Sequence, residues 1–124
     1  MTVVLVVVGG GLGALARYWL SGVVQRRVGS FPWGTMVVNL SGALLLGLAL
    51  GLAGGGNIET ALRDPLTIGA LGGYTTFSTW MVETNALGSG GGRLGVRRAA
   101  ANVVVPMIAG VGLASLGFAI GSAL

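Results

Sequence analysis

Four long apolar segments dominate this chain of 124 residues and leave little sequence outside them. They span approximately residues 2–24, 34–53, 66–87 and 99–124, and the connections between them are short and rich in glycine. An α-helix that crosses the ~30 Å hydrocarbon core of a bilayer needs about 20 mostly apolar residues. The sequence therefore predicts one membrane domain, residues 1–124, in the all-α class with four transmembrane helices.

Charged residues are scarce, and most of them lie between the apolar segments. Only 8% of the residues are charged, whereas soluble domains carry about 25%. The formal charge of +4 comes from arginines that form no continuous basic face, so the expected partner is the lipid bilayer and not a nucleic acid. The chain has no histidine, no cysteine and no nucleophile beside a base, so an enzyme is not expected.

The arginines outside the apolar segments are distributed unequally between the two sides of the bilayer. If the segments cross in alternating directions, one side holds five arginines and the other holds only Arg63, with Arg17 left out because it lies near the end of the first segment. The five are Arg26, Arg27, Arg93, Arg97 and Arg98. Because basic residues are in excess in cytoplasmic loops, both termini are expected outside the cytoplasm.

Glycine is abundant, with 25 residues. In lipid, small residues allow helix backbones to approach closely, so the glycines of the first, second and fourth segments are expected at helix contacts.

The third segment contains a stretch that is a poor helix former. Residues 72–80 are Gly-Gly-Tyr-Thr-Thr-Phe-Ser-Thr-Trp, with four hydroxyl side chains within five residues. A helix interrupted within the bilayer is tolerated where its freed backbone is buried or lines a wet cavity. Such a break can offer carbonyls to cations and N–H groups to anions. We expect the third helix to be broken here near the midplane; a glycine-packed kink is the alternative.

Four other side chains have two interpretations each. Asn39, in the second segment, is either an interhelical hydrogen-bonding group or part of a site. Arg17 either extends to the membrane interface or acts in the site. Phe77 and Trp80 either pack or present the positive edges of their rings to a small anion.

Three motifs, in this order along the chain, resemble those of the CrcB/Fluc fluoride channel family. Residues 10–18 (GGLGALARY) resemble the signature of its first helix, residues 32–42 (PWGTMVVNLSG) that of the second, and residues 72–80 (GGYTTFSTW) the break in the third. Asn102, which opens the fourth segment, also fits. The resemblance covers nearly the whole chain.

The resemblance implies a subunit of an antiparallel dimeric channel in the prokaryotic inner membrane, through which fluoride leaves the cytoplasm passively. It implies a structural sodium ion on backbone carbonyls of Gly72 and Thr75. The implied anion pathway is lined by Asn39, Phe77, Ser78, Thr79 and Trp80, with Arg17 adding charge at its mouth and with Asn102 and Ser115 as polar contacts from the fourth helix.

The chain departs from the family pattern at two places. Trp80 replaces a phenylalanine, and residues 103–107 (VVVPM) stand where the family often has tyrosine and serines. These departures predict that one of the two pores of a dimer is built weakly by this subunit. Together with the arginine bias, they favour a heterodimer with a homologous partner.

Two other functions are alternatives. A small multidrug transporter requires a carboxylate in its first helix, and the first segment has none. A partner-dependent, non-conducting subunit is the second alternative.

Overall fold

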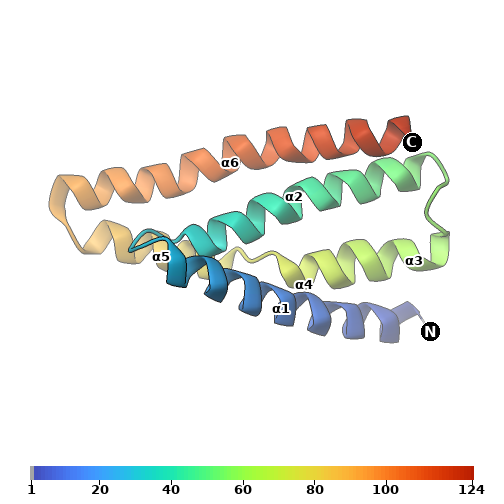
Figure 1. Ribbon diagram of the computed structural model, residues 1–124, viewed down its shortest axis with the longest axis horizontal. Coiled ribbons are helices and arrows are strands. Elements are labelled where there is room, and N and C mark those ends of the chain that lie inside the picture. Colours follow the sequence, from blue (N-terminus) through green and yellow to red (C-terminus); the bar gives the residue numbers. More distant parts are fainter. Residues whose placement is uncertain (1) are drawn as a thin grey trace.

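The computed structural model describes residues 2–124, and the residues it describes form helices and no strands (Figure 1). The elements are α1 (Thr2–Arg27), α2 (Trp33–Gly54), α3 (Thr60–Asp64), the π-helix η1 (Pro65–Leu71), α4 (Gly72–Tyr74), α5 (Ser78–Ser89) and α6 (Gly92–Ala123). Helices α1, α2 and α6 are long and apolar enough to cross a membrane. The predicted all-helical class is confirmed.

The helices lie side by side in one elongated bundle (Figure 1). α2 packs along α6, α1 packs along η1 and α4, and α5 contacts α6. The start of α1 and the end of α6 lie at the same end of the bundle, and the turn between α5 and α6 lies at the opposite end.

Glycines lie at close contacts between helices, as the sequence predicts. A Cβ atom at Gly117 of α6 would meet the carbonyl oxygen of Leu44 in α2, and one at Gly47 of α2 would meet that of Ala114 in α6. In α1, a Cβ at Gly13 would meet the carbonyl oxygen of Ala70. These contacts hold α2 on α6 and α1 on η1, because only a hydrogen atom fits between the backbones.

The third apolar segment and the residues just before it form several elements in succession. α3, η1 and α4 follow one another directly, the residues 75–77 are not helical, and α5 begins at Ser78. Thr75 has an extended backbone, with φ −79° and ψ 158°. The helical backbone is therefore interrupted between Tyr74 and Ser78, shortly after the two adjacent glycines.

The connection before the last helix is much shorter than residues 88–98, the stretch left between the expected apolar segments. α5 ends at Ser89 and α6 begins at Gly92, several residues before the expected start at 99. Gly92 has φ +53°, which lets the chain reverse within a few residues. The apolar pattern stops at the arginines, whereas the helix itself continues through them.

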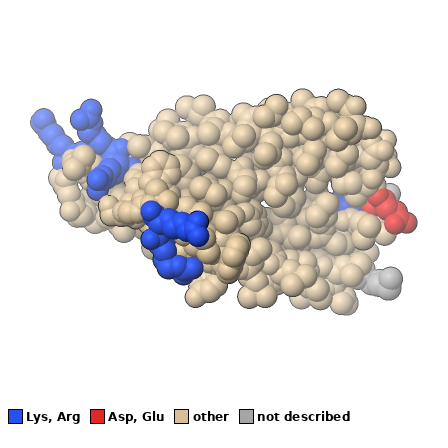
Figure 2. All heavy atoms as spheres, viewed as in Figure 1, with Lys and Arg blue, Asp and Glu red and all other residues tan. Residues whose placement is uncertain are grey.

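Basic side chains gather toward the end where α5 joins α6 (Figure 2). Arg26 and Arg27 form the last turn of α1, and Arg93, Arg97 and Arg98 lie in the first two turns of α6. The acidic atoms visible in Figure 2 lie at the opposite end. The charge asymmetry counted in the sequence is therefore an asymmetry between the two ends of the bundle.

Candidate functional site

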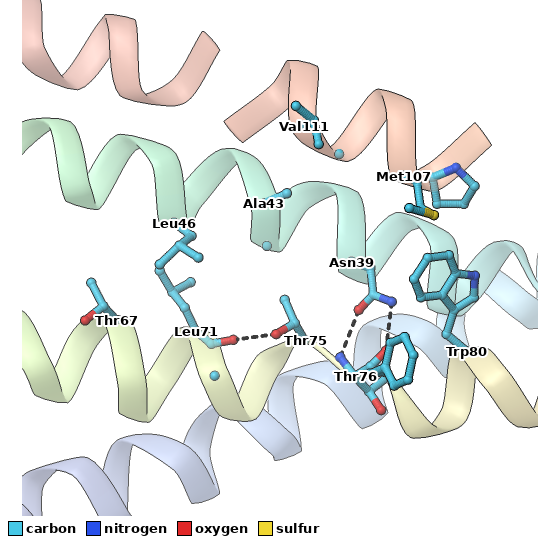
Figure 3. Close-up of a pocket in the computed structure, with 15 residues that line it drawn as sticks. Asn39, Ala43, Leu46, Thr67, Leu71, Thr75, Thr76, Trp80, Met107 and Val111 are labelled. Carbon is cyan, nitrogen blue, oxygen red and sulfur yellow. Dashed lines mark hydrogen bonds between the residues drawn. The ribbon is translucent and has the colours of Figure 1, made fainter. Parts of the chain in front are cut away.

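Asn39 on α2 holds the non-helical segment in place. Its side chain donates from Nδ2 to the carbonyl oxygen of Thr76 (2.9 Å) and accepts at Oδ1 from the N–H of Thr76 (2.9 Å), as the dashed lines of Figure 3 show. In a continuous helix the Thr76 N–H would bind the carbonyl of Gly72. Asn39 therefore replaces helical hydrogen bonds with its own, and so it keeps the backbone unwound.

Arg17 on α1 reaches the same segment from the other side. Its Nη1 donates to the carbonyl oxygen of Thr75 at 3.1 Å, and the side chain is half-buried. The N–H of Thr79, which a continuous helix would direct at this carbonyl, instead lies 3.3 Å from the hydroxyl oxygen of Thr76. Arg17 thus binds a backbone group that the interruption sets free, and does not simply extend to a membrane interface.

Hydroxyl groups line the start of α5. The hydroxyl of Thr76 lies 3.2 Å from that of Thr79 and 3.4 Å from that of Ser78. Ser78 and Thr79 are exposed in the single chain. Because a hydroxyl can donate as well as accept, this group can turn O–H bonds toward an anion.

The two aromatic rings of the segment contact each other. Phe77 and Trp80 are T-shaped, with ring centroids 5.9 Å apart and planes at 86°. Phe77 is 69% exposed, whereas Trp80 is half-buried. Such an arrangement places the positive edge of one ring against the negative face of the other.

Asn102 on α6 is bound to α5 at two points. Its backbone carbonyl accepts from the indole N–H of Trp80 at 2.6 Å, and its Nδ2 donates to the hydroxyl of Thr84 at 2.8 Å. Asn102 is only 1% exposed. This residue, expected as a polar contact of the fourth helix, is a buried link between α5 and α6.

Two cavities lie on either side of Thr76. The larger, about 400 Å³, is lined by Asn39, Phe77 and Trp80 among others (Figure 3). The smaller, about 260 Å³, is lined by Arg17 and Thr79 among others. The non-helical segment therefore separates an aromatic and amide-lined cavity from one that carries a positive charge.

The structure brings together most of the residues that the sequence singles out. Asn39 and Arg17 bind the non-helical residues 75–77. The residues 78–80 follow that stretch directly, and Gly72 precedes it by about one turn. Ser115 is the exception: it is exposed on α6, thirteen residues beyond Asn102, and lines neither cavity. On α6 the larger cavity is lined by residues without a hydrogen-bonding side chain, namely Pro106, Met107, Gly110 and Val111.

Sequence reasoning missed three polar residues that complete the site. Thr76 lines both cavities, and its backbone is the partner of Asn39. Thr84 binds Asn102, and Thr35 donates to Oε1 of Glu83 at 2.8 Å. Thr84 lies one helical turn after Trp80, and Thr35 one turn before Asn39, so the spacing of four residues was the available signal.

An all-helical membrane bundle with a polar, unwound segment between two cavities is the architecture of a membrane transport protein. The family model described as "CrcB-like protein, Camphor Resistance (CrcB)" matches residues 4–118. This chain belongs to the CrcB-like family, and the resemblance seen in its three motifs is confirmed.

Relatives with a stated function match over most of their length. A Thermus thermophilus protein named fluoride-specific ion channel FluC is 43% identical over 121 residues, which cover 97% of this chain and 94% of the relative. The Rhodospirillum rubrum protein of the same name is 42% identical over 112 residues, covering 87% and 84%. A Mycolicibacterium paratuberculosis protein named FluC 2 is 46% identical over 122 residues, covering 94% of each chain.

Proposed function

We propose that this chain is a subunit of a fluoride-specific ion channel that lets fluoride leave the cytoplasm passively and so reduces its toxicity. Membership of the CrcB-like family and the names of the relatives support a channel, which is not an enzyme. The observation that carries the proposal is the pair of hydrogen bonds between Asn39 and the backbone of Thr76, which we call the clamp. The clamp keeps a hydroxyl-rich segment unwound between two cavities. Fluoride efflux from liposomes tests it.

A small anion that enters this segment must exchange its water shell for groups of the protein. The hydroxyls of Ser78 and Thr79 supply O–H donors, and the exposed Phe77 supplies a positive ring edge. Helix α5 begins at Ser78, so the positive end of its helix dipole lies there. Arg17 adds a positive charge beside the smaller cavity. All of these groups favour an anion over a cation.

The carbonyls of Gly72 and Thr75 fit a structural sodium ion. Asn39 removes the helical donor of the Gly72 carbonyl, and Thr76 removes that of the Thr75 carbonyl. Hard oxygen donors of this kind suit a hard cation. The Thr75 oxygen also accepts from Arg17, and its second lone pair would serve the ion. A bound sodium ion would supply a fixed positive charge that holds the unwound segments of two subunits together.

The exposed part of the break supports the proposal that a second subunit covers it. Gly72, Phe77, Ser78 and Thr79 are exposed in the single chain. Non-helical backbone within the bilayer is tolerated only where protein or water covers it, and not against lipid. We place the break near the midplane, where an antiparallel partner brings its own break to the same depth.

The partner in this proposal is a homologous chain inserted in the opposite direction. The arginines at one end of the bundle favour a single orientation, with both termini outside the cytoplasm. Some relatives carry numbered names, such as FluC 2 and FluC 4, and this numbering is consistent with organisms that have more than one such chain.

Reporter fusions at the N-terminus and in the turn after α5 are expected to show one orientation for the great majority of molecules. The physical reason is the excess of arginines at one end, five against one. The control is a variant in which Arg93, Arg97 and Arg98 are changed to glutamine, which should yield both orientations. Equal populations of the two orientations in the unchanged chain would remove the heterodimer proposal.

One observation favours a partner-dependent subunit that builds only one good pathway. The α6 wall of the larger cavity has no hydrogen-bonding side chain among its lining residues, so a hydrated anion finds no substitute for water there. A multidrug transporter has no such support, because α1 contains no acidic residue.

A further inference from the structure

Pro106 lies inside α6, where a proline is costly. A proline has no N–H, so the carbonyl four residues earlier loses its helical partner. That carbonyl belongs to Asn102, which is 1% exposed, and Pro106 itself is buried. In water a freed carbonyl would be solvated. Here the carbonyl needs a donor from the protein, because a buried polar group without a partner is strongly destabilising.

The donor is the indole of Trp80. The indole nitrogen lies 2.6 Å from the Asn102 carbonyl oxygen, and its N–H replaces the backbone N–H that residue 106 lacks. A phenylalanine at position 80 has no donor to offer. The proline and the tryptophan are therefore matched to each other, although they lie on different helices and 26 positions apart in the sequence.

The hydrogen bond also fixes what Trp80 does in the larger cavity. Because the indole N–H is bound to a carbonyl, it is not available to an anion. Its ring is held against α6, and the Phe77 ring meets it edge to face at 5.9 Å. Phe77 is 69% exposed, and the Trp80 ring is the aromatic partner on which it packs. The orientation of Phe77 thus depends on α6 through Trp80.

We infer that Pro106 and Trp80 act as one unit, in which Trp80 is a positioning residue that satisfies the carbonyl freed by Pro106 and orients Phe77 for ion selection. This inference rests on the proposed channel function for its last step only. The pairing of Pro106 with Trp80 stands on the hydrogen bond alone.

A double-mutant cycle tests the unit: the unchanged chain, Trp80→Phe, Pro106→Ala, and the variant with both changes. Each is purified in detergent for thermal unfolding and reconstituted, with its partner chain if one is required, for fluoride and chloride efflux. Trp80→Phe is expected to lower the melting temperature by about 4–8 °C, because it leaves the Asn102 carbonyl without a donor. It is expected to lower the ratio of fluoride to chloride efflux about tenfold, because Phe77 is no longer held; this size rests on a discrimination of about 1.4 kcal/mol.

Adding Pro106→Ala to Trp80→Phe restores the backbone donor to the Asn102 carbonyl, so at least half of the loss in melting temperature should be recovered, whereas the efflux ratio should stay low because no indole holds Phe77. Trp19→Phe is the control, because Trp19 is exposed on α1 and no hydrogen bond of its indole occurs in the described structure. If Trp80→Phe lowers the melting temperature equally in the unchanged chain and in the Pro106→Ala variant, the pairing is overturned. An unchanged efflux ratio in Trp80→Phe would overturn the positioning role.

Two further outcomes are also decisive. If Trp80→Phe does not fold, folding of the double variant supports the pairing, and failure of both variants contradicts it. If the unchanged chain conducts no fluoride, the proposed function and the positioning of Phe77 both fail, while the melting temperatures of the cycle still decide the pairing.

Discussion

Replacing Asn39 with alanine is expected to reduce fluoride flux at least about tenfold and to lower the stability of the folded protein by about 1–3 kcal/mol. The side chain binds both the N–H and the carbonyl of Thr76. Without it, both groups lose their partner, and they regain one only if the segment rewinds, with the N–H on the carbonyl of Gly72 and the carbonyl on the N–H of Trp80. The break then closes, and the Gly72 oxygen is lost to a cation.

Asn39→Asp tests the effect of a negative charge at the position of the clamp. Aspartate still accepts from the Thr76 N–H but cannot donate to the Thr76 carbonyl, and it places a negative charge in the anion pathway. We expect it to lose flux more completely than alanine does at a similar stability. Ser41→Ala, two residues further along α2, removes a bond to Tyr74 but leaves Thr76 untouched. Flux in Asn39→Ala equal to that of Ser41→Ala would contradict the role of the clamp.

Gly117→Ala is expected to destabilise the protein by about 1–3 kcal/mol through overpacking. A Cβ at this position meets the carbonyl oxygen of Leu44 and lies 2.8 Å from the N atom of Leu48. Both are backbone atoms of α2, so no side chain can rotate away, and the two helices must separate. Denaturant unfolding in detergent measures the loss.

Gly112→Ala, on the same helix, is the matched control. No atom lies within 4 Å of a Cβ at that position, so the change is expected to be neutral or to stabilise by up to about 1 kcal/mol, as alanine is the better helix former. If the two variants unfold alike, close packing at Gly117 is not what holds α6 on α2.

Apolar length and glycine content were enough to predict the helical membrane class and the presence of glycines at close helix contacts, but not that α2 packs along α6. The non-helical residues 75–77 lie within the motif at residues 72–80, where glycine and hydroxyl residues are poor helix formers. Helix ends were less predictable. α6 starts at Gly92 because a helix can continue past the hydrocarbon region, where hydropathy no longer marks it.

The sequence did not predict which residues form hydrogen bonds with each other across helices. Asn39 was open to two interpretations because an amide in a transmembrane helix has many potential partners, and only the fold shows that Thr76 is one of them. Trp80 and the apolar run with Pro106 appeared as two separate departures from the family pattern. The structure joins them through the carbonyl of Asn102, a backbone group that no residue pattern marks.

The central claim is tested most directly by fluoride efflux from liposomes that contain the purified chain, alone and together with a homologous chain of opposite arginine bias. We expect fluoride to leave down its gradient in the paired sample, much faster than chloride, with weak flux from the chain alone. Replacing sodium by a large organic cation on both sides should abolish the flux. The absence of fluoride flux from correctly folded protein in both samples would contradict the channel function.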